Sequence, residues 1–177
     1  HSDLHPTPLA DGRVLYAGYS RTGEPPDGGA GRFSLRSMTW EGVELNEVHG
    51  GHGGPRLRAM PAEMPDRTVA FIESDGEQPD GSGRLVQIAW SRPLAGPRPL
   101  ADDGARYRDP RPLPDGRTLV ARAEGSGSFA LWLHDRVAGR PQQLVFDDPA
   151  WHDVDGLAVA PHAEPMARIP AVWPERF

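Results

Sequence analysis

Histidines and aspartates near two glycine-containing loops are the residues of this chain with the clearest chemical potential. In His49-Gly-Gly-His52, the flexible glycines could bring two imidazoles to one Zn²⁺ ion. A second group places His152 beside Asp153 and Asp155, and its carboxylate oxygens are ligands suited to Ca²⁺. These five residues are therefore the candidate metal ligands. The simpler alternatives are a surface loop, since the histidine pair lacks a third ligand, and a solvated acidic connector, since no complete calcium loop is present.

No other chemistry stands out. No serine lies in the strand-turn-helix context that a nucleophile elbow requires. The chain has no cysteine, which excludes disulfides, thiolate metal sites and a Cys-x-x-Cys-His haem attachment within these residues. We therefore assign no catalytic and no cofactor-binding residue, and we expect any haem to belong to a part of a longer protein outside this chain.

The candidate ligands are positioned by a repeated unit. Residues 5–17 return as residues 109–121 with eight of thirteen positions identical, and both copies contain Asp-Gly-Arg. A worn copy, Pro-Asp-Arg-Thr-Val-Ala-Phe, occupies residues 65–71 and lacks the glycine. The aspartates Asp11, Asp66 and Asp115 are about 50 residues apart, a period typical of repeated supersecondary units.

Each copy continues with short apolar runs, Gly-rich loops and alternating apolar residues, which indicates antiparallel strands joined by hairpins. The sequence predicts strands near residues 14–17, 33–40, 69–72, 85–90, 118–122 and 129–134. About four strands per copy is the anatomy of a propeller blade, and the 20 prolines and 21 glycines disfavour helices. The strand aromatics, Trp40 among them, are expected in the core between blades.

The predicted fold is all-β: a partial β-propeller of three four-stranded antiparallel blades plus the first strand of a fourth. The blades are expected at about residues 5–48, 55–100 and 105–146, the extra strand at 152–160, and a Pro-rich extended exit at 161–177. Propellers close with about four to eight blades, so two faces would stay open. We expect this chain, which starts at His1 without a methionine, to be a piece of a longer protein. The ring would be closed by other blades of the parent or by dimerisation.

Strand order predicts where a ligand would bind. The connectors from the outer strand of one blade to the inner strand of the next, residues 49–54, 101–104 and 147–156, should converge on one face near the channel mouth. The candidate metal ligands lie in the first and last of these connectors.

The motif Pro-x-x-Leu-Pro-Asp-Gly-Arg, followed by a strand, a Gly loop and a second strand, resembles the TolB-like β-propeller repeat over about 150 of the 177 residues. Within that group, residues 40–52 and the Pro-rich exit resemble the propeller (middle) region of hydrazine synthase alpha subunit-like proteins. Glu41 stands where that family usually has Asp, and Val48-His49 replaces Leu-Tyr. The resemblance implies a large extracytoplasmic bacterial protein, periplasmic or secreted, whose haem-binding segments lie outside these residues.

Two functions remain open. One is a non-catalytic scaffold that presents loops to other domains or protein subunits. The other is the propeller part of a haem- or metal-dependent oxidoreductase subunit similar to hydrazine synthase alpha. The net charge of −6 argues against nucleic acid as the main partner, and no apolar run approaches the ~20 residues that span a bilayer.

Overall fold

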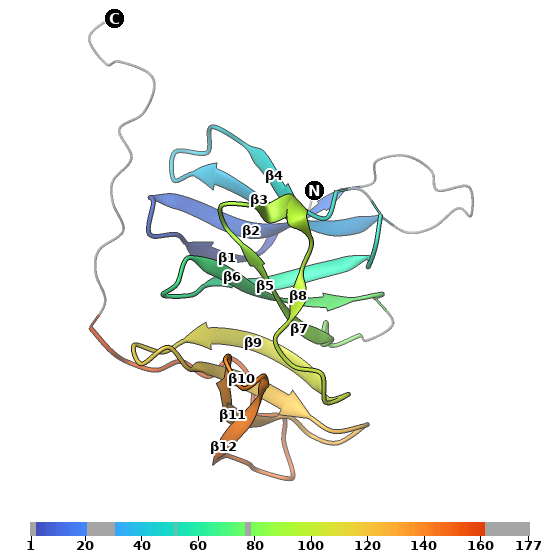
Figure 1. The fold of residues 1–177 in the computed structure, drawn as a ribbon. Helices are drawn as coiled ribbons and strands as arrows, with labels where there is room; N and C mark the ends of the chain where they lie inside the picture. Colours follow the sequence, from blue (N-terminus) through green and yellow to red (C-terminus); the bar gives the residue numbers. More distant parts are fainter. Residues whose placement is uncertain (1–2, 21–30, 52, 77–78, 162–177) are drawn as a thin grey trace, which may run out of the picture.

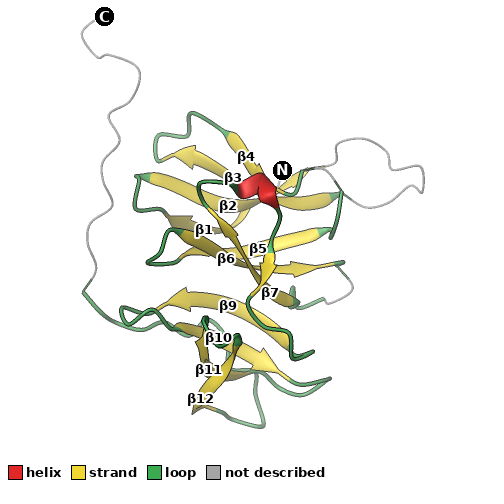
Figure 2. Ribbon diagram, viewed as in Figure 1, coloured by secondary structure: helices red, strands yellow, loops and turns green. Residues whose placement is uncertain are grey.

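The computed structural model describes residues 3–20, 31–51, 53–76 and 79–161, and this part of the chain is built from strands (Figures 1 and 2). Three antiparallel four-stranded sheets follow one another along the chain. The first contains β1 (Asp3–Pro8), β2 (Arg13–Ser20), β3 (Arg32–Thr39) and β4 (Asn46–His49). The second contains β5 (Leu57–Glu63), β6 (Thr68–Ser74), β7 (Arg84–Ala89) and β8 (Arg98–Pro99). The third contains β9 (Arg106–Pro112), β10 (Thr118–Ala123), β11 (Ala130–Asp135) and β12 (Arg140–Phe146).

The predicted all-β fold and its strands are confirmed. Within the described ranges the sole helical element is a single 3₁₀ turn, Pro93–Ala95, between β7 and β8. No helix in this part of the chain is long and apolar enough to cross a membrane.

The sheets stack face to face in chain order, with the first, second and third from top to bottom of Figure 1. The inner strands of the second and third sheets pack on the preceding sheet. β5 contacts β1, β2 and β3, and β9 contacts β5, β6 and β7. Between the first two sheets lies a buried apolar layer that includes Leu15, Leu35, Phe71 and Ile88. This arrangement, with its core divided into layers between successive sheets, is that of consecutive propeller blades.

The predicted Asp-Gly-Arg turns link the inner strand of each blade to the second strand. In the first turn the Leu9 N–H bonds the Arg13 carbonyl at 2.8 Å, and the Asp11 carboxylate accepts the Arg13 backbone N–H at 3.2 Å. The other two turns repeat both bonds. Gly12 and Gly116 have φ values of 83° and 85°, as expected for glycine in a tight turn, and Arg67 takes the same place in the worn copy with a φ of 62°.

The inner strands share a second feature, a bulge before proline. His5, Met60 and Asp109 each precede a proline and have φ values of 54°, 55° and 49°. The pairing register with the second strand shifts at each of these positions. A left-handed conformation is rare for residues other than glycine, so its recurrence marks a built-in feature of the repeat.

Residues 152–161 form no strand, but they contain a fourth left-handed residue, which here precedes glycine and not proline. Asp155 has a φ of 53°, the Asp153 N–H bonds the Phe129 carbonyl at 2.8 Å, and Gly156 lies against Leu119 and Leu131. The segment therefore follows the third blade as an inner strand of the next blade would, but it has no hydrogen-bonded neighbour strand among the described residues.

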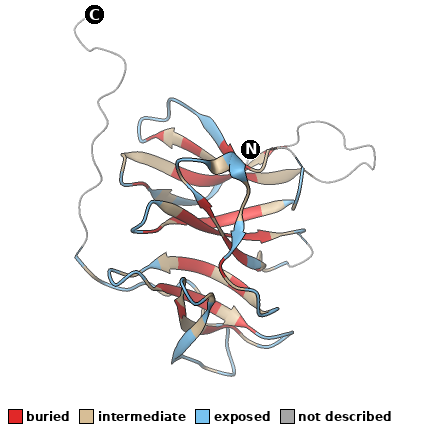
Figure 3. Ribbon diagram, viewed as in Figure 1, coloured by how far each residue is buried: buried red, intermediate tan, exposed pale blue. Residues whose placement is uncertain are grey.

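Figure 3 shows exposed segments at the two ends of the stack, and several of their residues are apolar. On β12, Leu144, Val145 and Phe146 are exposed, and Leu157 and Val159 follow in the last described segment. In the first blade Trp40 is 66% exposed, so the expectation that it lies in the core between blades is wrong. The reason is its place in the stack: Trp40 belongs to a blade that has a described neighbour on one side alone.

Candidate functional site

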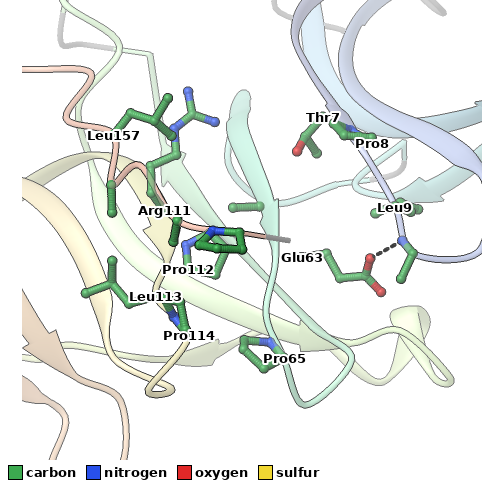
Figure 4. Close-up of a pocket in the computed structure, with 15 residues that line it drawn as sticks. Thr7, Pro8, Leu9, Glu63, Pro65, Arg111, Pro112, Leu113, Pro114 and Leu157 are labelled. Carbon is green, nitrogen blue, oxygen red and sulfur yellow. Dashed lines mark hydrogen bonds between the residues drawn. The ribbon is translucent and has the colours of Figure 1, made fainter. Parts of the chain in front are cut away.

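A pocket of about 520 Å³ lies where the ends of the inner strands converge (Figure 4). It is lined by residues 7–10, 62–63, 65, 111–114, 157–158 and 160–161. These segments come from all three blades and from the segment after β12. Most of the lining is proline, leucine and alanine, as is usual in pockets that bind small molecules.

The repeat explains how the pocket wall is made. Thr7, Ala62, Arg111 and Leu157 each lie two residues beyond a left-handed residue, at equivalent places in the four segments, and all four line the pocket. Three of these side chains are uncharged. Arg111 therefore gives the wall its single positive charge at this level.

The other charged residue of the wall, Glu63, is already engaged. Its Oε2 accepts the Ala10 backbone N–H at 2.6 Å, and its Oε1 lies 3.1 Å from Nη1 of Arg67. Glu63 thereby ties the turn of the first blade to the second blade, so we assign it a structural role.

Arg111 is less fully paired. Its Nη2 lies 3.9 Å from Oδ1 of Asp155, at the outer limit of an ion pair, and its Nε is buried without a hydrogen-bond partner. A buried guanidinium N–H without a partner is costly, because it loses its bonds to water without replacement. The Arg111 side chain as a whole is 37% exposed, so the site contains a cationic group that a ligand can reach.

A smaller chamber of about 40 Å³ adjoins this wall, lined by His5, Met60, Asp109, Arg111 and the three bulge prolines. Asp109 is buried, and its Oδ2 accepts the Asp155 backbone N–H at 3.3 Å. Burial and the nearby Asp155 carboxylate raise the pKa of Asp109 above its ordinary value. Burial lowers the pKa of His5, against the attraction of both carboxylates.

The predicted metal ligands lie in several environments. His49 ends β4 and is buried, with its ring against Phe71 and its Nδ1 2.9 Å from the Pro93 carbonyl. Burial lowers the pKa of His49. His152 packs on Phe129 in the third blade and accepts that residue's backbone N–H through Nδ1. His52 lies outside the described residues.

The two aspartates are also separate in role. The Asp153 carboxylate accepts the Asp148 backbone N–H at 2.8 Å, which closes a local turn. Asp155 instead donates its backbone N–H to Asp109, and its carboxylate lies near Arg111. Over residues 3–20, 31–51, 53–76 and 79–161, no three His, Asp or Glu side chains gather as a metal site would require. The Zn²⁺ site at His49 and His52 and the Ca²⁺ site at His152, Asp153 and Asp155 stay predictions.

Sequence reasoning looked for a ligand at the connectors and missed the pocket at the opposite ends of the inner strands. The pocket is beside the Asp-Gly-Arg turns. The pocket could have been found from the repeated X-Pro pairs at residues 5–6, 60–61 and 109–110. These pairs identify the inner strands and the register at which their side chains reach the axis.

The fold and the axial pocket define the class of this chain as a partial β-propeller, and no family model matches its sequence. The chain is similar to the propeller region of hydrazine synthase alpha: it is 30% identical over 159 residues to hydrazine synthase subunit alpha of Kuenenia stuttgartiensis, which covers 86% of this chain and 19% of the relative. The solved Kuenenia stuttgartiensis hydrazine synthase superposes with a TM-score of 0.74 at 28% identity, over 86% of this chain and 20% of that one.

A second solved structure, puromycin hydrolase, superposes with a TM-score of 0.61 at 22% identity over 80% of this chain and 22% of that one, which is a likeness of fold. This chain spans about a fifth of the length of these relatives.

Proposed function

We propose that this chain is a non-catalytic scaffold within the propeller of a larger protein similar to hydrazine synthase alpha. In this role the three blades hold other blades, domains or subunits in place through their two open faces. An extracytoplasmic location, periplasmic or secreted, is part of the proposal, supported by the resemblance to that family.

The observation that carries the proposal is that residues just after the third strand of a blade contact the first turn of the preceding blade, whereas Trp40 in the first blade has no such contact among the described residues. Trp90, just after β7, stacks under the guanidinium of Arg13 in the preceding blade at 4.6 Å. Arg136, just after β11, bonds both carboxylate oxygens of Asp66 in the preceding blade. Trp40 follows β3 at the position corresponding to Trp90, yet it is exposed.

The contact between Arg13 and Trp90 indicates what would cover this face. A preceding blade with an Asp-Gly-Arg turn would place its arginine over Trp40, as Arg13 lies over Trp90, with a cation–π attraction of about 0.5–2 kcal/mol. Burial of Trp40 and the neighbouring Val43 and Leu45, all exposed, would add an apolar contribution.

The alternative function is the propeller part of a haem- or metal-dependent oxidoreductase subunit. The likeness to hydrazine synthase favours it, since that relative is named as an enzyme. Because the chain contains no cysteine, a haem attached through a Cys-x-x-Cys-His motif would come from elsewhere in the protein.

The two functions differ in one experiment on a longer protein that contains the remaining blades. The purified protein is titrated with haem and analysed for bound metal, and hydrazine formation is assayed. A scaffold leaves the haem spectrum unchanged and carries no stoichiometric metal. Stoichiometric haem or metal, together with hydrazine formation, would overturn the scaffold proposal in favour of the oxidoreductase.

The proposal that another blade covers the face around Trp40 is tested by the accessibility of this tryptophan to a quencher. Trp40 should be quenched by acrylamide in this chain, with Trp40→Phe to assign its signal, and protected in a longer protein that contains the remaining blades. Equal quenching in both proteins would contradict the proposed cover.

A further inference from the structure

We propose that the axial pocket binds a small organic carboxylate, with Arg111 as its anion-binding residue. This inference concerns a ligand site and is independent of the scaffold proposal. Neither the open faces nor the candidate metal ligands take part in it, apart from Asp155, whose carboxylate lies near Arg111.

The shape and lining of the pocket set the class of ligand. A volume of about 520 Å³ matches the range of pockets that enclose small organic molecules. Leu9, Ala62, Leu113 and Leu157 provide apolar walls around the axis (Figure 4). An apolar body of one or two rings would displace water from these walls, which is favourable in proportion to the area covered.

Charge then selects the polar group of the ligand. Glu63 is neutralised by Arg67 and the Ala10 N–H, so it leaves the wall without a free anion at that point. Arg111 has a buried Nε without a hydrogen-bond partner and a loose 3.9 Å approach to Asp155. A carboxylate accepts two parallel bonds from a guanidinium, and would pair with the Arg111 side chain, which is 37% exposed.

A cation is disfavoured by the same geometry, because it would have to approach Arg111, and the nearby Asp155 carboxylate already lies 3.9 Å from that guanidinium. A neutral ligand would gain the apolar contacts but would leave the guanidinium as it is. The preference for an anion over its neutral isostere is therefore the distinctive property of this site.

The test compares naphthoate with neutral naphthamide, each titrated into the intact chain by calorimetry at neutral pH. We expect naphthoate to bind more tightly than naphthamide. Arg111→Gln should weaken naphthoate about tenfold, the usual value of a hydrogen-bonded charge, and leave naphthamide unchanged. Arg111→Lys retains the positive charge but cannot form the two parallel hydrogen bonds of a guanidinium, so it should give an intermediate affinity for naphthoate.

Arg117→Gln is the matched control. Arg117 belongs to the same Asp-Gly-Arg repeat and the same blade, but it is bonded to Asp115 and does not line the pocket. Leu157→Ala, at an exposed wall position, should weaken both probes alike. Circular dichroism checks that each variant keeps its strands.

Three results would overturn the proposal. One is equal affinity of the native chain for naphthoate and naphthamide. The second is an equal loss of naphthoate binding in Arg117→Gln and Arg111→Gln, which would indicate general attraction to positive charge. The third is no binding of either probe at millimolar concentration by the folded chain.

Discussion

Arg58 on β5 and Glu73 on β6 face each other in a buried ion pair, with 3.1 Å between Nε and Oε1 and side chains 5% and 3% exposed. Arg58 also donates to the carbonyls of Gly50 and Pro55, in the connector between the first and second blades. Gly50 leaves the space that the guanidinium needs, because a Cβ there would lie 2.4 Å from Arg58 Cδ. One buried charge pair thus fixes both a strand pair and the path of the chain between blades.

Glu73→Gln should lower the free energy of unfolding by about 3 kcal/mol or more, because it leaves the Arg58 charge buried without its counter-ion. Urea denaturation measures the change. Glu124→Gln is the control, since Glu124 pairs with Arg122 at the surface and is itself mostly exposed; its loss should cost under about 1 kcal/mol. Equal losses in the two variants would show that burial of the Arg58–Glu73 pair is not what matters.

Arg67→Gly should stabilise the chain by roughly 0.5–1 kcal/mol. Arg67 adopts a left-handed φ where the other two turns have glycine, and relief of that strain, ~1–2 kcal/mol, exceeds the entropy that glycine adds to the unfolded chain. The ion pair lost with Glu63 is exposed on the arginine side and contributes little. Thermal unfolding detects the gain, and a lower melting temperature would contradict this prediction.

Gly116→Val makes the opposite change at the equivalent turn of the third blade, because it replaces glycine by a residue with a side chain. No atom lies within 4 Å of a Cβ built at Gly116, so the cost comes from the backbone φ of 85° and not from a clash. We expect a loss of about 1–3 kcal/mol in unfolding free energy. Naphthoate binding by the folded fraction should be unchanged, whereas a weaker affinity at unchanged stability would show that the turn takes part in the ligand site.

Stability should fall with acidification through His134. This residue on β11 is fully buried, its ring meets Tyr107 edge to face, and neither ring nitrogen has a hydrogen-bond partner. Burial lowers the pKa of His134, so the unfolded chain binds this proton more readily than the folded one. The stability is complete above the unfolded pKa of about 6.5 and declines as the pH falls below it.

His134→Leu should reduce this acid dependence and raise the unfolding free energy near neutral pH by about 1–2 kcal/mol, because an apolar side chain replaces unpaired ring nitrogens. Urea midpoints measured on either side of pH ~6.5 test both effects. The same acid slope in the variant and the native chain would exclude His134 as its source.

The repeat made the blades predictable because turn, strand and loop signals are local and occur three times. Trp40 was misplaced because burial at the end of a stack depends on whether a neighbour is present, which the strand pattern of one blade does not encode. The axial pocket was missed for a related reason: Thr7, Ala62, Arg111 and Leu157 are far apart in sequence and differ in type. Their shared position follows from a left-handed backbone at four residues, three of them at bulges, and this conformation is not expected for His5, Met60, Asp109 or Asp155.

The stack also has a consequence for how the molecule comes apart. Among the described strands, those of the first sheet contact the second sheet, and the third sheet contacts the second, with no contact between first and third. When each sheet contacts only its neighbours, the terminal sheets are held from one side and unfold more easily than the middle one. Amide hydrogen exchange should therefore be slowest in β6, which is covered on both sides, and the outer blades should open as separate units before the middle one does.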